Sequence, residues 1–278
     1  SDLDIAYNPN DEDSYLTNGK GKGYNQLHLN AMYDLLDRIY TDIIIQPAKL
    51  ENEHKAFCDM LDRYAGIKKT IFIVDRGYES YNDLAHVMEK GAFFLFRSKD
   101  INSNGIVYGL KHKLPEKDEF DATISIILTR KSTKEVRNHP EIYKCFHTKD
   151  NFDYIDLDKN PYYKMNFRVL RFPISETSYE CVITNLPQTE FTASEIKKLY
   201  AMRWGIETSF RELKYAAELT GFHSKKREYI IQEIWARLIL YNFSEVITAH
   251  VTIEKVYKEA CLSNELYNCN TYMQIFHK

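Results

Sequence analysis

The sequence lacks several features that would assign it to a narrow class of protein. Its 278 residues carry a formal net charge of only -3, so no overall basic character indicates a nucleic-acid partner. No apolar run approaches the ~18 residues of a membrane span, and no stretch has the pattern of a signal peptide, so we expect no membrane association. Contact with nucleic acid would depend on local basic clusters, such as Arg211, Lys214, Lys225, Lys226 and Arg227.

Cysteine usage excludes a disulfide framework and a zinc site built on paired cysteines. The five cysteines are odd in number, widely spaced and form no C-x-x-C pair (Cys58, Cys145, Cys181, Cys261 and Cys269). This usage is typical of reduced cysteines in an intracellular protein, and we expect a cytoplasmic location. The start at Ser1, without methionine, indicates an excised or incomplete chain.

The residues that are present are sufficient for a substantial core. With 44% hydrophobic residues, the chain is expected to form one large domain or one domain with an insertion. Thr70–Val74 is apolar and bounded by charge, which predicts a central strand buried on both faces. Around it, the patterns predict strands over 1–8, 26–36, 38–46 and 92–97 and helices over 51–64 and 80–90. This order predicts an α/β fold with part of the sheet parallel.

The middle of the chain has a different pattern. From 98 to 187, short β-type runs alternate with polar turns and no convincing long helix, which predicts a mostly β insertion. We therefore divide the chain into a first part of the core over 1–97, the insertion over 98–187, and a second part of the core with the C-terminal helices over 188–278. Within the last part, residues 227–249 predict a long helix, and a helix with a ragged tail follows from about Ile253.

The stretch from Glu195 to Leu219 predicts one long helix that carries two stripes. At about 100° per residue, the first stripe is apolar and core-facing. Beside it runs a polar stripe, again within roughly 80° of arc, in which one carboxylate stands among three cations and a phenol. Its members are Tyr200, Arg203, Glu207, Arg211 and Lys214. The simpler interpretation is a solvent-facing row of ion pairs, each worth only about 0.2–0.5 kcal/mol.

The spacing Tyr200-x2-Arg203-x3-Glu207-x6-Lys214 resembles the Y-R-E-K element of DDE transposases of the insertion-sequence-4 group. The resemblance implies that Glu207 is a catalytic, metal-binding carboxylate. It also implies that Tyr200, Arg203 and Lys214 contact DNA phosphates, and Arg211 is a further candidate on the same stripe. Arginine suits this role because its planar guanidinium donates to two phosphate oxygens at once.

A second element supports the same resemblance. Asp75 follows the predicted central strand, at the edge where α/β sheets usually place their sites. The alternative is an ordinary turn aspartate. The wording Asp75-Arg-Gly-Tyr-Glu-Ser80 resembles the family's D-R-G-Y-x-S around its second catalytic aspartate. The resemblance covers about residues 1–250 and implies a ribonuclease-H-like mixed sheet flanked by helices, with the β insertion before the helix that carries the last catalytic Glu.

The first acid of the family pattern has no clear counterpart. The resemblance places it on the first strand, just before Ser1. Asp2 and Asp4 lie on that strand but not at the matching position, and Asp34 is more simply a strand-end residue. We expect the first ligand to be missing from this span, which would then bind metal weakly and cut poorly.

The resemblance implies the function of a transposase core. It would use two Mg²⁺ (or Mn²⁺) ions, held by Asp75 and Glu207, to cleave phosphodiester bonds at the ends of an insertion sequence and to transfer the strands to target DNA. The expected partner is double-stranded DNA, bound as a dimer, in the nucleoid of a bacterial cytoplasm. Two alternatives stay open: a DNA-binding or regulatory relic without catalysis, and a metal-dependent nuclease on the same fold.

Aromatic residues of the insertion provide one further hypothesis. Tyr162, Tyr163, Phe167 and Arg168 could stack on or clamp an unpaired base, as the family's insertion does. Packing in the core explains the same residues more simply.

Overall fold

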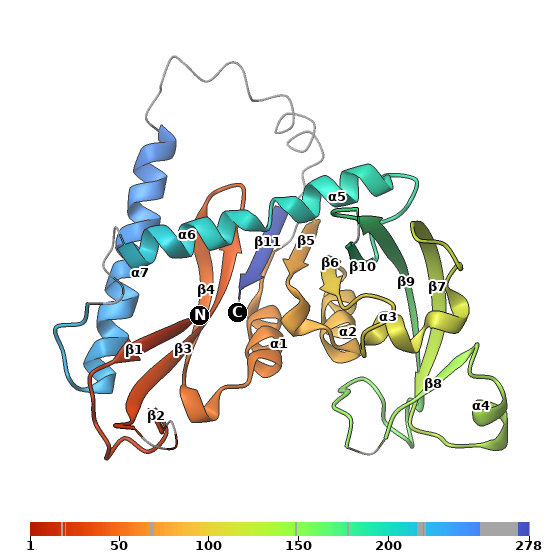
Figure 1. Ribbon diagram of the computed structural model, residues 1–278, viewed down its shortest axis with the longest axis horizontal. Coiled ribbons are helices and arrows are strands. Elements are labelled where there is room, and N and C mark those ends of the chain that lie inside the picture. Colours follow the sequence, from red (N-terminus) through yellow and green to blue (C-terminus); the bar gives the residue numbers. More distant parts are fainter. Residues whose placement is uncertain are drawn as a thin grey trace. The chain divides into compact units, whose positions relative to one another are not determined.

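The chain forms two compact units in the computed structural model. Unit 1 comprises residues 1–71 and 201–278, and unit 2 comprises residues 72–200. Strands flanked by helices make up the fold, and strand pairs of both antiparallel and parallel kinds occur (Figure 1). This confirms the predicted mixed α/β fold class, which is consistent with a ribonuclease-H-like fold. The structure describes residues 1–17, 19, 21–66, 69–147, 149–176, 178–215, 219, 221–250 and 272–277.

Strand β3 (Tyr24–Asp34) is the centre of the sheet in unit 1. It pairs antiparallel with β4 (Ile39–Pro47) through residues 27–34 along one edge. Strands β1 (Asp2–Ile5) and β11 (Tyr272–His277) therefore pair with the other edge of β3. The short strand β2 (Tyr15–Leu16) pairs with the first residues of β3. Every residue of β3 from position 27 onward is buried, so both faces of this strand are covered.

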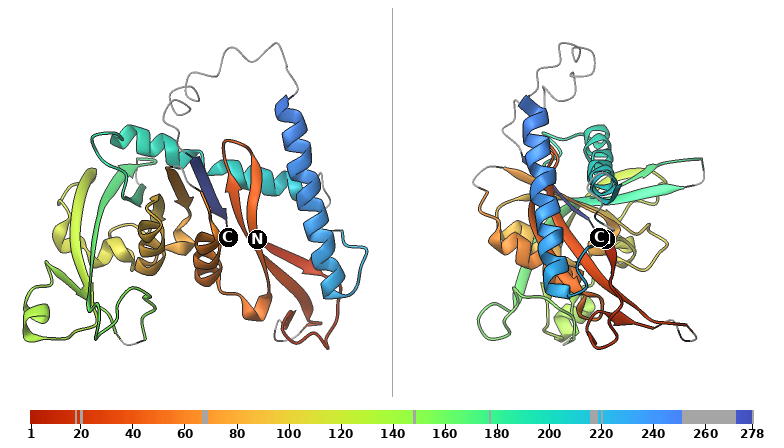
Figure 2. Two further views of the ribbon diagram at one scale, coloured as in Figure 1. Left: turned by 180° about the vertical axis from the view of Figure 1, so that it is seen from behind. Right: turned by 90° about the vertical axis from the view of Figure 1, so that its left-hand side faces the viewer.

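An aromatic cluster packs two helices of unit 1 onto the β3–β4 hairpin. The ring of Tyr40 makes edge-to-face contacts with Tyr33, Phe210 and Tyr241, at centroid distances of 5.1, 5.6 and 5.3 Å. Such contacts contribute about 0.5–1.5 kcal/mol each beyond the burial of area. Figure 2 shows the long helix α7 running beside β4. The helices of this unit are α1 (Glu53–Arg63), α6 (Trp204–Tyr215) and α7 (Arg227–His250), with the 3-10 turn η1 (Ala48–Leu50).

The strands of unit 2 follow the order β5-β6-β10-β9-β7-β8. Strand β10 pairs antiparallel with β6 and β9, β9 pairs antiparallel with β7, and β7 pairs parallel with β8. All five residues of β5 are buried, as predicted for a central strand. The strands are β5 (Thr70–Val74), β6 (Phe93–Ser98), β7 (Phe120–Thr129), β8 (Tyr143–Cys145), β9 (Tyr162–Pro173) and β10 (Tyr179–Thr184).

In unit 2, helix α2 begins and ends at residues whose types favour helix ends. The Ser80 hydroxyl accepts a hydrogen bond from the Asn82 backbone N–H and caps the start of the helix. Gly91, at φ +67°, lies just past its end in the left-handed region that glycine adopts most easily. Between residues 98 and 187 the described helices are all short. The helical elements of unit 2 are η2 (Arg76–Tyr78), α2 (Tyr81–Glu89), α3 (Ile106–Gly109), η3 (Lys111–Lys113), α4 (Lys134–Asn138) and α5 (Ala193–Ala201).

The predicted single helix over 195–219 is wrong, because a turn at Met202 and Arg203 separates α5 from α6. The backbone N–H of Gly205 donates to the Met202 carbonyl at 2.9 Å, a bond over three residues rather than four. A Cβ at Gly205 would lie 2.7 Å from Leu35 Cδ2, so the start of α6 approaches the β3–β4 turn very closely. Buried Leu199 and Ile206 continue the apolar spacing across the turn, which conceals it in the sequence.

Some predictions concern the end of the chain. The helix expected from about Ile253 lies outside the described residues, as do 216–218 and 220 after α6. Residues 272–277 form the strand β11. In the described part of the chain, no helix is both long enough and apolar enough to cross a membrane.

Candidate active site

Asp75 lies where the buried strand β5 ends and the turn η2 begins. Its Oδ1 accepts a hydrogen bond from the Arg76 backbone N–H at 2.8 Å, so the side chain caps the turn. Glu79, at the end of the same turn, accepts from the Ser98 hydroxyl at 2.7 Å and from the Lys99 N–H at 2.9 Å. These bonds fasten the turn to the end of β6. The Asp75 carboxylate thus stands, partly exposed, on a backbone held at both ends.

Two side chains from distant parts of the sequence meet Asp75 within unit 2. The Tyr200 hydroxyl of α5 lies 3.4 Å from Asp75 Oδ1. Arg97 of β6 places Nη1 at 3.7 Å from the same oxygen, while its Nε donates to Glu180 at 2.9 Å. The sequence analysis predicted Tyr200 as a site residue but did not assign a role to Arg97. The available signal was its position at the end of the strand that follows the Asp75 turn.

Glu207 lies in the first turn of α6, in unit 1. Its Oε1 accepts a hydrogen bond from Arg203 Nη1 at 2.6 Å, and the Arg203 guanidinium also lies 5.3 Å from the Trp204 ring. The exposed fraction is 31% for the Glu207 side chain but only 4% for Arg203. A charged hydrogen bond on a buried arginine is stronger than one between two exposed side chains. The pair is therefore more than the solvent-facing row of the simpler interpretation.

The neighbouring face of α6 fixes this helix on unit 1. Ile206, Phe210 and Leu213 are buried, as the predicted apolar stripe requires. Ser209 is buried as well, and its hydroxyl shares a 2.8 Å hydrogen bond with the Tyr40 hydroxyl. These contacts fix the side of α6 from which the Glu207 side chain leaves the helix, and the bond to Arg203 holds its carboxylate.

The basic candidates differ in their surroundings. Lys214 lies close to the start of β1, near enough to Ser1 to act on it electrostatically. Arg211 is exposed on α6. Arg227 instead pairs with Asp11 at 2.5 Å within unit 1. Lys214 and Arg211 are thus better suited than Arg227 to an incoming phosphate.

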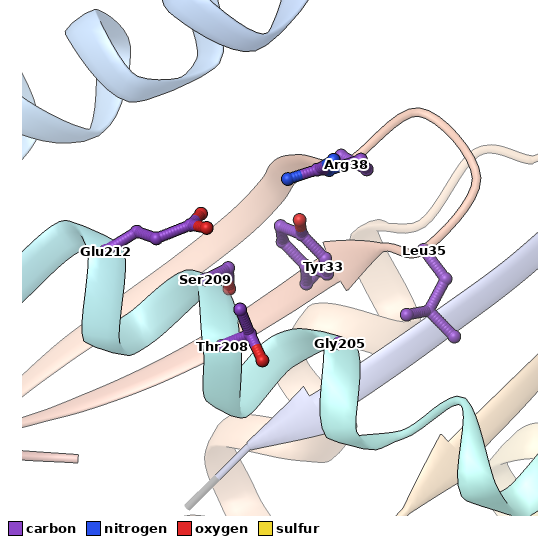
Figure 3. A pocket seen from close by; sticks show the side chains of 7 residues that line it. All are labelled: Tyr33, Leu35, Arg38, Gly205, Thr208, Ser209 and Glu212. Carbon is purple, nitrogen blue, oxygen red and sulfur yellow. The ribbon is translucent and has the colours of Figure 1, made fainter. Parts of the chain in front are cut away.

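A cavity of about 290 Å³ lies between α6 and the β3–β4 turn (Figure 3). Arg38 stands at this cavity and pairs with Glu245 at 3.1 Å. None of the predicted site residues lines it. The lining residues are Tyr33, Leu35, Arg38, Gly205, Thr208, Ser209 and Glu212.

The three alternative first acids are engaged in local contacts. Asp34 Oδ1 accepts from the backbone N–H groups of Leu36 and Asp37 at 2.8 and 3.0 Å, which is the geometry of a strand-end turn. Asp4 accepts from the Gln26 amide at 3.1 Å. Asp2 lies 2.7 Å from a ring nitrogen of buried His28.

Comparison with known families decides the assignment. The family model described as "Transposase DDE domain" matches residues 4–243 of the chain. The chain belongs to this family. Membership implies a transposase-type enzyme that processes nucleic acid, with DNA as its substrate. The match spans Asp75 and the whole of the Tyr200–Lys214 element. No curated protein matches the chain.

In this DDE domain, most of the proposed base-binding side chains are interior. Arg168 is buried and makes two hydrogen bonds to Asp121, at 3.1 and 2.6 Å. Tyr163 is buried too, and its hydroxyl donates to Glu89 at 2.8 Å. Phe167 is also buried, whereas Tyr162 is exposed. Packing therefore accounts for three of the four, and Tyr162 alone among them presents a ring for stacking.

Proposed function

We propose that this DDE domain is the catalytic core of a transposase of the insertion-sequence-4 group. It would cleave phosphodiester bonds at the ends of an insertion sequence and join them to target DNA. One observation carries the proposal. Each predicted acid has a residue of the Y-R-E-K element beside it, Tyr200 at Asp75 and Arg203 at Glu207. An ordinary surface row of charges gives no reason for Tyr200 to meet an acid 125 residues away.

The predicted ligands fit Mg²⁺ or Mn²⁺ by their chemistry. Asp75 and Glu207 offer carboxylate oxygens at partly exposed positions, with exposed fractions of 35% and 31%, and hard cations prefer oxygen ligands. Two bound ions would activate the attacking oxygen and stabilise the leaving oxygen of the phosphodiester. The third ligand would be the first-strand acid that the resemblance places before Ser1.

The chain's own residues would orient these groups and bind the DNA. Arg203 was expected to contact phosphate. Its buried guanidinium holds Glu207, so we propose positioning of this carboxylate as its first role. Tyr200 and Arg97 would orient Asp75 in the same way. Lys214 and Arg211 would bind the phosphates of double-stranded DNA, whose two transposon ends a dimer would hold.

A regulatory relic without catalysis is the second candidate. The observation that favours it is the engagement of Asp2, Asp4 and Asp34 in other contacts, which leaves the first acid to residues outside this span.

The deciding experiment measures Mg²⁺-dependent cleavage and strand transfer on DNA that carries the element's ends. It uses a chain that includes the first-strand acid implied upstream of Ser1. We expect Asp75→Asn and Glu207→Gln to lower the cleavage rate by about a thousandfold or more, because each removes a charged metal ligand. Glu212→Gln on the same helix is the matched control and should retain activity. Cleavage without joining would indicate the nuclease, and specific DNA binding without cleavage would indicate the relic.

A further inference from the structure

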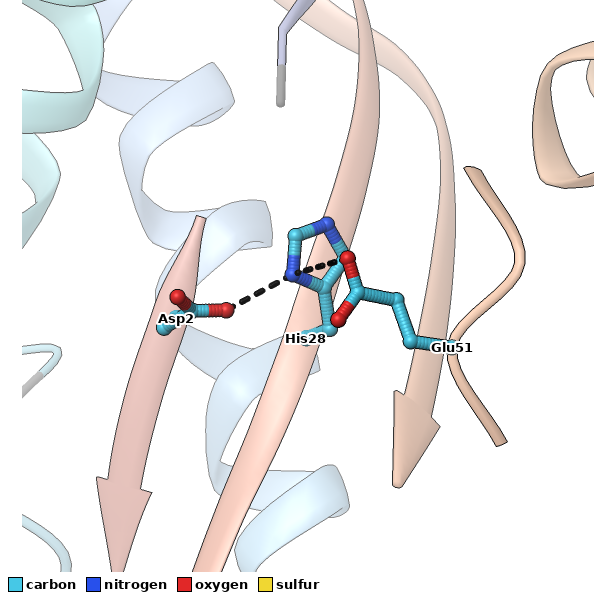
Figure 4. A group of neighbouring side chains, drawn as sticks. All are labelled: Asp2, His28 and Glu51. Atoms are coloured by element: carbon cyan, nitrogen blue, oxygen red, sulfur yellow. Dashed lines mark hydrogen bonds and ion pairs between the residues drawn. The ribbon is translucent and has the colours of Figure 1, made fainter. Parts of the chain in front are cut away.

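A separate cluster of ionisable side chains lies in unit 1, on β1, on β3 and around the start of α1. Asp2 and His28 are directly opposite partners in the β1–β3 pair, so their side chains share one face of the sheet. His28 Nδ1 lies 2.7 Å from Asp2 Oδ1 and 3.5 Å from Glu51 Oε1 (Figure 4). On the other side of the ring, His28 Nε2 lies 3.4 Å from Glu53 Oε1.

The charges of these four side chains do not balance, even when Lys214, which acts on Ser1 beside the cluster, is counted. His28 contributes at most one positive charge, yet it faces three carboxylates. Its side chain is only 4% exposed, and within the described part of the chain its Nε2 makes no hydrogen bond. An uncompensated negative charge beside a buried side chain costs free energy of folding. The excess of negative charge around a buried nitrogen donor is what a cation would offset.

We propose that Asp2, Glu51 and Nδ1 of His28 form a binding site for a divalent transition-metal cation such as Zn²⁺. One ligand atom from each residue already lies within 4.8 Å of the other two. A tetrahedral Zn²⁺ with bonds of about 2.0–2.2 Å spaces its ligand atoms roughly 3.3–3.6 Å apart. The 3.5 Å between His28 Nδ1 and Glu51 Oε1 already fits this spacing. Asp2 Oδ1, at 2.7 Å from Nδ1, has to move outward by somewhat less than an ångström. The side chains of Asp2 and Glu51, 57% and 36% exposed, are free enough to do this by rotation.

The donor set favours Zn²⁺ over Mg²⁺ and Ca²⁺. Imidazole nitrogen suits zinc and its neighbours, whereas Mg²⁺ and Ca²⁺ take oxygen ligands. Glu53 has the position of a supporting carboxylate, because its Oε1 lies 3.4 Å from Nε2 of His28. With the ring proton on Nε2, the Nδ1 lone pair is available to the cation. The fourth position is left to water. The bound ion would tie β1 and β3 to the segment that leads into α1.

The test is metal binding by the purified chain after treatment with a chelator. Calorimetric titration with Zn²⁺ should show one ion per chain, and Co²⁺ should give the visible absorption bands of a nitrogen- and oxygen-ligated ion. Asp2→Asn and Glu51→Gln should each weaken Zn²⁺ binding by about tenfold or more, as loss of a ligand does. Asp4→Asn is the matched control on the same strand, outside the cluster, and should bind as the wild type does.

The proposed site would be overturned if Zn²⁺ showed no saturable binding, or if Asp2→Asn and Glu51→Gln bound Zn²⁺ as tightly as the wild type does. It would also be overturned if Zn²⁺ binding were lost in Asp75→Asn and Glu207→Gln instead. The last outcome would place the ion at the proposed catalytic acids. Nuclear magnetic resonance of the imidazole nitrogens adds a direct readout. Zn²⁺ should shift Nδ1 of His28, whereas a histidine that serves only as a protonated ion-pair partner would keep its resonance unchanged. This site does not depend on the proposed cleavage reaction, and its binding test requires no activity.

Discussion

Asp75 in unit 2 and Glu207 in unit 1 are both partly exposed carboxylates, yet their surroundings come from different stretches of sequence. Asp75 accepts from the backbone beside it and meets Arg97 and Tyr200, which lie far along the chain. Glu207 is held by Arg203, four residues earlier. The surroundings of the strand-end acid Asp75 thus depend on the tertiary fold, whereas those of Glu207 depend largely on the turn just before its own helix.

The largest expected effect is on the free energy of unfolding when each acid is removed from beside its arginine. Glu207→Ala leaves the charge of Arg203 buried without its carboxylate, which should lower the free energy of unfolding by about 3 kcal/mol. Asp75→Ala leaves Arg97, whose side chain is 33% exposed, in reach of water and should cost about 1 kcal/mol. Urea unfolding followed by circular dichroism measures both. Glu207→Gln, which keeps a hydrogen-bond acceptor for Arg203, is the control and should recover part of the loss.

Equal destabilisation by the two alanine variants would contradict the comparison. It would mean that Arg203 finds compensation elsewhere when Glu207 is removed, and that burial does not distinguish the two acids.

The next effect concerns activity. Arg97→Met should lower the cleavage rate of the upstream-extended chain by about 10–100-fold, because a residue that orients a metal ligand typically contributes that much. Arg76→Met, beside Asp75 but exposed, should change it little. A cleavage assay at saturating DNA separates the two variants. If Arg97→Met cleaves at the wild-type rate, Arg97 does not orient Asp75, and its role is limited to the ion pair with Glu180.

Features that depend on local sequence could be predicted, whereas features that depend on tertiary contacts could not. Thr70–Val74 was predicted to the residue, because an uninterrupted apolar run bounded by charge has few other interpretations. The turn at Met202 and Arg203 was missed, because the apolar spacing continues across it and its cause, the approach of Gly205 to Leu35, is tertiary. The contact of Arg97 with Asp75 was missed for the same reason, since the neighbour of a strand in its sheet is not encoded in local periodicity.

The roles of the predicted site residues stay predictions. The Tyr200 hydroxyl lies beside Asp75 and the Arg203 guanidinium beside Glu207, but the burial of Arg203 could not be predicted from an alternation of charges. His28 also gave no signal, because its partner Asp2 is close only through the strand register.

A smaller effect is expected for a phosphate contact, which orients neither acid. Lys214→Ala should weaken DNA binding only a few-fold at moderate salt. It should also reduce the slope of log affinity against log salt by about 0.9, the release of one counterion. Fluorescence anisotropy across a salt series measures this. Lys55→Ala, on α1 and paired with Asp59, is the control. An unchanged slope for Lys214→Ala would remove this residue from the DNA interface.

The smallest expected effect concerns a carboxylate that is held by backbone N–H groups, in contrast to Glu207, which is held by an arginine. Glu233 of α7 accepts from the backbone N–H groups of His223 and Ser224 at 3.0 and 2.8 Å. These bonds lower its pKa from 4.5 to about 2. Because the pKa is lower in the folded state, the contribution to stability is complete above about pH 4.5 and is lost as the pH falls toward 2. Thermal unfolding of Glu233→Gln should therefore differ from the wild type at pH 7 and converge with it near pH 2. The difference should be modest, because the Glu233 side chain, 21% exposed, is still within reach of water that screens its charge. A gap that persists unchanged at low pH would show that the carboxylate charge is not what the two N–H groups stabilise.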